Sequence, residues 1–208
     1  MKLIFDLDGT LVDSAPGVLA TLAYVTKEHR VHAKKEISSN LIGHPLKTIL
    51  EELCGSSDPG VIEPLECTFK EHYDTTGVLQ TSAYEQIDQM LCTLQQMGHS
   101  LYIATNKRKK PTIMLMNHFK LDRYFKGVFS LDTFSPPMPD KAALLQRILS
   151  CEALLIEETI YVGDRPEDGQ AARINDLKFL HAVWGYGPSL ENDLQHVLYK
   201  PADIFQYV

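Results

Sequence analysis

Two carboxylates stand close together near the start of the chain. Asp6 and Asp8 follow the apolar residues 3–5 and are two positions apart. In extended backbone both side chains would leave the same face, with Cα atoms roughly 6 to 7 Å apart. Such a pair needs a neutralising cation or a proton on one of its members. Because Gly9 permits a sharp turn directly afterwards, the stretch predicts an acidic site where a strand ends.

Two later segments also end in polar side chains. Residues 100–105 form an apolar run that ends in Thr105 and Asn106, and residues 159–162 lead into Gly163 and Asp164. Ligands bind at the carboxyl ends of the strands in a parallel sheet. We therefore expect these strand ends to meet in one pocket. There the Thr105 hydroxyl and the Asn106 backbone N–H, placed by this prediction at the start of a helix, could bind a phosphoryl oxygen.

The aspartates at these strand ends form a candidate metal site. They are Asp6, Asp8, Asp164 and Asp168. They offer only oxygen, the donor atom that Mg2+ prefers, and Mg2+ commonly binds between carboxylates and a substrate phosphate. Lys141, at the start of a predicted helix, could keep Asp6 ionised and offset charge on a transferred group. The residues thus favour a Mg2+ site that acts on a phosphate ester.

The elements that must position these residues alternate between strand and helix. Strands are expected over residues 3–5, 100–105, 128–131, 159–162 and 179–183, and helices over residues 84–97, 111–119, 141–149 and 166–174. Such alternation implies right-handed crossovers and helices on both faces of a sheet. The predicted fold class is α/β, with a doubly wound parallel sheet.

One long segment interrupts this alternation. Between residues 15 and 81 no strand-like run occurs, and the apolar spacing predicts helices over 18–30, 46–53 and about 60–73. We expect a helical domain over residues 15–81, inserted into a core domain made of residues 1–14 and 82–208.

Composition narrows the class of protein. The chain has 208 residues, of which 44% are hydrophobic and 23% charged, as in ordinary globular proteins. Its net charge of -7 argues against a nucleic-acid partner. No apolar run approaches membrane-spanning length, and the four cysteines form no C-x-x-C pair. We expect a cytoplasmic protein whose partner is a small phosphorylated metabolite, not a membrane, and which is a monomer or a homodimer.

Four segments together resemble the haloacid dehalogenase superfamily of phosphatases. They are residues 6–10 (Asp-Leu-Asp-Gly-Thr), residues 105–107 (Thr-Asn-Lys), Lys141, and residues 163–168 (Gly-Asp-Arg-Pro-Glu-Asp). Residues 105–107, 163–164 and 183–187 (Val-Trp-Gly-Tyr-Gly) resemble the phosphoglycolate phosphatase-like branch. The resemblance covers nearly the whole chain. It implies a Rossmann-type core with a helical cap inserted after the first motif.

The resemblance also implies roles for single residues. Asp6 would attack phosphorus and form an aspartyl-phosphate, whereas Asp8 would protonate the leaving oxygen and later take a proton from water. The backbone carbonyl of Asp8 would join Asp6 and Asp164 around Mg2+, and Asp168 would act on metal-bound water. Because Asp8 is present, dehalogenation is disfavoured.

The remaining site residues are expected around the phosphate and the leaving group. Gly9, Thr105, Asn106 and Lys107 would bind the phosphate, and Lys107 is the second choice for the role given to Lys141. Glu167 is the alternative to Asp168 as the acid that faces the metal. Gly43 and His44 resemble a cap loop that reaches the substrate, where His44 and Lys47 could touch the leaving group. A plain Gly-Pro turn before a helix explains the same residues equally well.

Three other functions stay open on the sequence. A sugar-phosphate mutase could share the fold and the first half of the reaction. A signalling receiver domain also uses acidic residues, a threonine and a lysine around Mg2+, but its phosphoacceptor follows a later strand, and the length and cap disagree. A binding protein with an idle site is the third alternative.

Overall fold

The core of the protein is a parallel sheet of six strands. The computed structural model describes residues 1–188 and 196–208. The strand order is β5-β4-β1-β6-β7-β8, with β1 in the middle of the sheet. The strands are β1 (Lys2–Phe5), β4 (Ser100–Thr105), β5 (Phe125–Ser130), β6 (Thr159–Gly163), β7 (Lys178–Ala182) and β8 (Val197–Leu198). The predicted fold class is confirmed.

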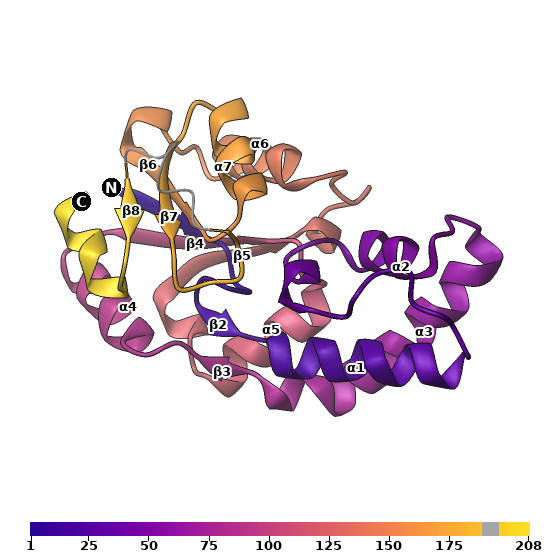
Figure 1. The fold of residues 1–208 in the computed structure, drawn as a ribbon. Helices are drawn as coiled ribbons and strands as arrows, with labels where there is room; N and C mark the ends of the chain where they lie inside the picture. Colours follow the sequence, from indigo (N-terminus) through magenta and orange to yellow (C-terminus); the bar gives the residue numbers. More distant parts are fainter. Residues whose placement is uncertain (189–195) are drawn as a thin grey trace.

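Helices cover both faces of this sheet, as Figure 1 shows. They are α4 (Ile87–Gln96), α5 (Lys109–His118), α6 (Lys141–Cys151) and α7 (Pro166–Ile174). Leu3 and Phe5 belong to one buried apolar cluster and Ile4 to another, because successive side chains along a strand alternate between the two faces. The second cluster contains Leu144 and Leu145 of α6. Burial on both faces explains why the strands read as short, continuous apolar runs.

Three helices lie beside the sheet, at the right of Figure 1. They are α1 (Ala15–Glu28), α2 (Leu46–Cys54) and α3 (Pro59–Thr75). The chain enters this segment through β2 (Val12–Asp13) and leaves it through β3 (Ser82–Ala83), which pair antiparallel. The proposed boundaries of a cap domain, residues 15–81, stay a prediction. We refer to residues 15–81 as the cap segment.

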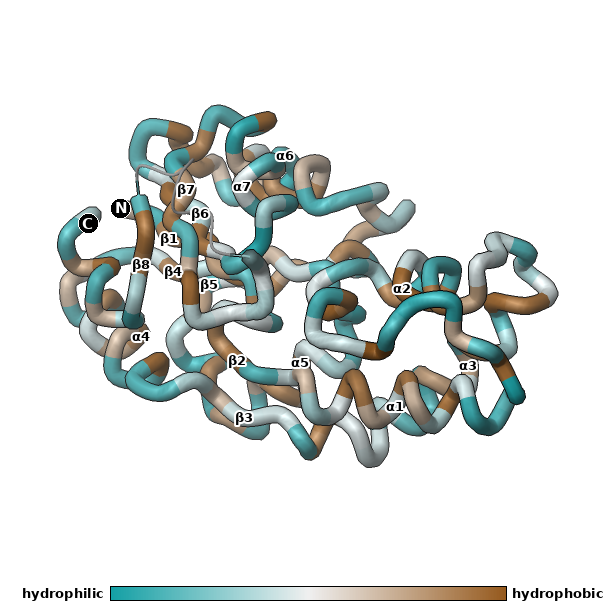
Figure 2. The backbone as a smooth tube through the Cα atoms, viewed as in Figure 1, coloured by the Kyte–Doolittle hydropathy of each residue, from teal (hydrophilic) through white to brown (hydrophobic). Residues whose placement is uncertain are grey.

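Hydrophobic and hydrophilic stretches alternate along the backbone of both parts, as Figure 2 shows, and the buried hydrophobic residues form two core clusters. The strands β2, β3 and β8 have two residues each and were not predicted, because two residues carry no detectable periodicity. Among the described residues, no helix combines the length and the apolar character that crossing a membrane requires.

Candidate active site

Three aspartates from distant parts of the chain meet at the carboxyl end of the sheet. Asp6 directly follows β1 and Asp164 directly follows β6, which is the neighbour of β1. Asp168 lies in the first turn of α7. One carboxylate oxygen from each of the three lies within 4.8 Å of the others, and all three side chains are buried. The strand order therefore brings together three of the four aspartates expected from the sequence.

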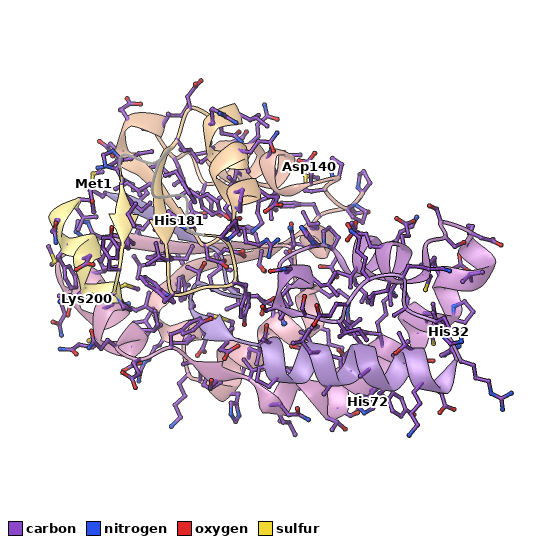
Figure 3. The ribbon with its side chains drawn as sticks, viewed as in Figure 1. Met1, His32, His72, Asp140, His181 and Lys200 are labelled. Atoms are coloured by element: carbon purple, nitrogen blue, oxygen red, sulfur yellow. The ribbon has the colours of Figure 1, made fainter. Side chains whose placement is uncertain are left out.

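Lys141 is buried against this cluster. Its Nζ lies 2.9 Å from Oδ1 of Asp6 and 3.1 Å from Oδ1 of Asp168. The Tyr161 hydroxyl, from β6, also donates to Oδ1 of Asp168, at 2.8 Å. Asp140, labelled in Figure 3, precedes Lys141, and its side chain accepts a hydrogen bond from the backbone N–H of Ala143. This N-cap fixes the first turn of α6 and so the position of Lys141.

The charges in this cluster do not balance. Burial raises the pKa of Asp6 to about 7, against the pull of Lys141 and with help from the charges of Asp168 and Asp164. Burial and the charge of Asp168 raise the pKa of Asp164 to about 6. Burial opposes a charged Lys141, but Asp168 and Asp6 outweigh it and raise its pKa to about 12. Three carboxylates thus face one lysine, and their oxygens fit a hard divalent cation.

Asp164 is fixed by backbone groups. Its Oδ2 accepts hydrogen bonds from the backbone N–H groups of Tyr186, at 2.8 Å, and Gly187, at 3.4 Å. A Cβ on Gly9 would lie 2.3 Å from the same oxygen, so only glycine allows this close approach. This gives Gly9 a packing role beside the cluster. Its predicted contact with phosphate stays a prediction.

The carboxylate of Asp8 is not part of the three-aspartate cluster and has other partners. Its Oδ1 accepts hydrogen bonds from the Ser14 hydroxyl, at 2.6 Å, and from Nζ of Lys107, at 3.0 Å. Asp8 therefore contributes no side-chain oxygen to the cluster. The role of its backbone carbonyl as a ligand stays a prediction. Asp6 and Asp8 face different partners, as their different expected roles require.

Lys107 connects the core to the cap segment. It follows β4, is buried, and its Nζ donates to the Tyr73 hydroxyl of α3 at 2.8 Å. Burial opposes its charge, but Asp8 and Tyr73 outweigh this and raise its pKa. Its backbone N–H donates to the hydroxyl of Thr105 at 3.2 Å. Lys107 thus lies against Asp8, whereas Lys141 lies against Asp6.

A loop of the cap segment is held onto the core by hydrogen bonds to its backbone. Arg165 donates to the carbonyl of Ile42 at 2.8 Å and to that of Asn40 at 3.1 Å. The side-chain amide of Asn106 donates to the carbonyl of Gly43 at 2.8 Å. Gly43 has a φ of 94°, and a Cβ there would lie 2.6 Å from Cδ of Arg165. We call these contacts of Arg165 and Asn106 the loop clasp.

Three other expectations concern this region. The helix α5 begins at Lys109, so the Asn106 N–H lies in the preceding loop and not at a helix start, as the sequence had suggested. Glu167 is half exposed and pairs with Arg165, so that Asp168 is the acid that faces the cluster. The Lys47 side chain is exposed and lies 3.9 Å from Glu51, away from the site.

Two cavities adjoin the cluster. The first has about 60 Å3 and lies between Asp6, Asp8 and Thr105 on one side and the cap segment on the other. The second has about 280 Å3 and is lined by Lys141, Asp168 and other core residues. Asp6, Gly43, His44 and Asn106 border both cavities. The two spaces therefore meet at Asp6.

The sequence profile of the haloacid dehalogenase-like hydrolases matches residues 3–182. The chain belongs to this family. It is 28% identical to the phosphoglycolate phosphatase of Aquifex aeolicus over 97% of this chain and 93% of that protein. It is 26% identical to a 5'-nucleotidase of Pseudomonas aeruginosa, over 89% and 84%. A solved haloacid dehalogenase-like hydrolase from Streptococcus pneumoniae superposes with a TM-score of 0.87, at 27% identity, over 99% of this chain and 97% of that chain.

Membership of the haloacid dehalogenase-like hydrolase family confirms the resemblance found in the sequence. With its phosphatase-named relatives, it makes the chain an enzyme, a phosphoric monoester hydrolase. The three-aspartate cluster is the place where this member of the family can hold a divalent metal. The sequence motifs include Arg165 without indicating its role, and they indicate no role for Ser14 or Tyr161. The contacts of Arg165 join segments more than 120 positions apart in the chain, whereas Ser14 and Tyr161 bind aspartates six and seven positions away.

Proposed function

We propose that this hydrolase is a Mg2+-dependent phosphatase that hydrolyses a small organic phosphate monoester through an aspartyl-phosphate on Asp6. The observation that carries the proposal is the convergence of Asp6, Asp164 and Asp168 beside Lys141. An acidic cluster built only from oxygen donors suits Mg2+ better than a metal that prefers nitrogen or sulfur.

Asp6 is oriented for attack on phosphorus. Its Oδ1 lies 2.9 Å from Lys141 Nζ and accepts a hydrogen bond from the backbone N–H of Leu7 at 2.8 Å. Both contacts go to Oδ1, which leaves Oδ2 to act as the nucleophile. Lys141 favours the ionised form that attack requires and offsets charge on the phosphoryl group.

Asp6, Asp164 and Asp168 would hold the metal ion. A bound divalent ion neutralises the charge of the carboxylates and of the substrate phosphate and thereby stabilises the transition state. The backbone N–H groups that hold Asp164 orient it without adding a competing cation. Asp168 is held by hydrogen bonds from Lys141 and from the Tyr161 hydroxyl.

Asp8 lines the first cavity and serves first as the general acid and then as the general base. As Asp6 bonds to phosphorus, the ester P–O bond breaks and Asp8 gives its proton to the leaving oxygen. A water molecule then attacks phosphorus, Asp8 accepts a proton from it, and the bond from phosphorus to Asp6 breaks.

A phosphate-release assay tests this proposal. The wild-type enzyme should release phosphate from p-nitrophenyl phosphate with Mg2+ and lose at least about a hundredfold of this rate when Mg2+ is chelated. Asp6→Asn should abolish turnover, and Asp164→Asn should raise the Mg2+ concentration needed. Asp122→Asn, an exposed acid outside the site, should behave as wild type. Undiminished turnover of Asp6→Asn would overturn the proposal.

A further inference from the structure

The first cavity has one polar side and one apolar side. Asp6 and Asp8 lie on the polar side, where the ester bond would be broken. The cap segment, which would receive the organic part of the substrate, contributes His44, Tyr73 and a larger set of hydrophobic side chains to the lining. These hydrophobic side chains are Val18, Ile42, Leu46, Ile49 and Phe69. All except Leu46 are buried, so this apolar surface is a fixed part of the fold.

The cations that border this cavity already have partners. Lys107 is bound to Asp8 and to the Tyr73 hydroxyl. Both terminal nitrogens of Arg108 donate hydrogen bonds to the buried carboxylate of Asp74. A carboxylate or second phosphate on the substrate would have to break one of these pairs or remain buried without a counter-charge. Either outcome is costly in an apolar surrounding.

The loop that contributes to this lining is tied to the core. Arg165 and Asn106 hold residues 40, 42 and 43 onto the core. Residues 42 and 43 line the cavity. The loop clasp therefore holds the hydrophobic side chain of Ile42 in the cavity wall.

From these observations we infer that the preferred substrate carries an uncharged and largely hydrocarbon group, such as a short branched alkyl phosphate. The inference rests on the proposed function and adds the chemical class of the leaving group. Phosphoglycolate, whose carboxylate would face Ile49 and Phe69, should then be a poor substrate, although several relatives are named for it.

Isobutyl phosphate and phosphoglycolate form a matched pair for the test. The two leaving groups have the same branched skeleton of non-hydrogen atoms, and only the second carries a charge. The enzyme should show a kcat/KM about tenfold or more higher for isobutyl phosphate. Because glycolate is intrinsically the better leaving group, such a preference would have to come from binding. Equal values, or a preference for phosphoglycolate, would overturn the inference.

A second experiment adds a positive charge to the cavity lining and measures how the substrate preference changes. Leu46→Lys puts an unpaired cation at the half-buried edge of the apolar side and should shift the ratio of the two kcat/KM values about tenfold toward phosphoglycolate. Thr48→Lys adds the same charge to α2 at a residue that does not line the cavity, and should leave the ratio unchanged. An unchanged ratio in a folded Leu46→Lys enzyme would count against the inference.

Turnover of p-nitrophenyl phosphate separates the two proposals. If Asp6-dependent turnover of this ester occurs but isobutyl phosphate is not preferred, the inference fails and the proposed function stands. If no ester is hydrolysed in the presence of Mg2+, the proposed function fails as well. Should Leu46→Lys not fold, the wild-type comparison of the matched pair decides the question by itself.

Discussion

Nζ of Lys107 lies 3.0 Å from Oδ1 of Asp8, and the same nitrogen donates to the hydroxyl of Tyr73 at 2.8 Å. A core lysine therefore joins the proposed acid to helix α3 of the cap segment. The contact fixes the Asp8 carboxylate in the lining of the first cavity, where the proposed mechanism places the leaving group. Lys107 is a positioning residue in this account, since it acts through Asp8.

Lys107→Met should lower kcat for an alkyl phosphate by about 10- to 100-fold, because a misplaced acid protonates the leaving oxygen poorly. The loss should be small with p-nitrophenyl phosphate, whose leaving group needs no proton. Steady-state kinetics with both esters measure this difference. Lys110→Met, at an exposed position nearby, is the control and should change neither rate more than a few-fold. Equal losses with both esters would indicate a purely structural role for Lys107.

Asp8→Asn should show the same dependence on the leaving group, with a larger loss of about 100-fold or more for alkyl phosphates. Because Lys107 acts through Asp8, the double variant Asp8→Asn/Lys107→Met should be no slower than Asp8→Asn alone. The four kcat values of this cycle provide the measurement. Fully multiplicative losses would show that the two residues act independently.

The pKa of Asp6 predicts how pH affects the metal-free enzyme. In the folded state this pKa is about 7, compared with an ordinary value of 3.8. Between these values the folded protein holds a proton that the unfolded chain has released, so Asp6 lowers stability as pH rises through this window. Asp6→Asn removes the effect. In chelator, the free energy of unfolding of Asp6→Asn minus that of wild type should therefore increase from about pH 4 to pH 7. The increase should be at most about 1.4 kcal/mol per pH unit.

Urea unfolding of both proteins at several pH values checks this prediction. Mg2+ should act in the opposite direction in wild type, because its ligands must lose their protons before they bind the ion. The stabilisation by Mg2+ should thus grow between about pH 5 and pH 8 and be weak in Asp6→Asn. A difference between the two proteins that shrinks as pH rises in chelator would contradict the assigned direction of the shift.

The loop clasp should matter for both stability and substrate binding. Arg165→Gln removes the donors to the carbonyls of Ile42 and Asn40 and should cost about 1–3 kcal/mol of unfolding free energy. KM should rise because a loop that lines the cavity is released. Chemical denaturation and kinetics measure the two effects. Arg173→Gln, an exposed arginine on the same helix, is the control, and equal behaviour of the two variants would refute the clasp.

Much of the architecture could be predicted from local patterns. The strand 100–105 and the helix 166–174 were predicted with their observed bounds. A buried strand is recognised by its continuous apolar run, and a helix start by proline in its first turn. The polar residues that follow β1 and β6 also indicated that Asp6 and Asp164 would meet. That inference needs only parallel strands, whose carboxyl ends share one edge of the sheet.

The partners of Asp8 could not be predicted in this way. Lys107 was expected at the phosphate, yet its Nζ lies between Asp8 and Tyr73. Tyr73 reaches it only because α3 packs beside the core, and apolar periodicity does not specify where a helix is placed. The same reason applies to Arg165, whose side chain binds backbone carbonyls more than 120 positions away. Every residue has a backbone carbonyl, so the sequence does not indicate which carbonyl accepts a side-chain hydrogen bond.

Identification of the phosphorylated residue tests the central claim most directly. The enzyme, mixed with Mg2+ and substrate and quenched in acid during turnover, should yield a peptide containing Asp6 that is heavier by one phosphoryl group. The same peptide from Asp6→Asn should remain unmodified. If wild-type enzyme turns over substrate while no phosphoryl group is found on Asp6, or if it is found on another residue, Asp6 is not the nucleophile.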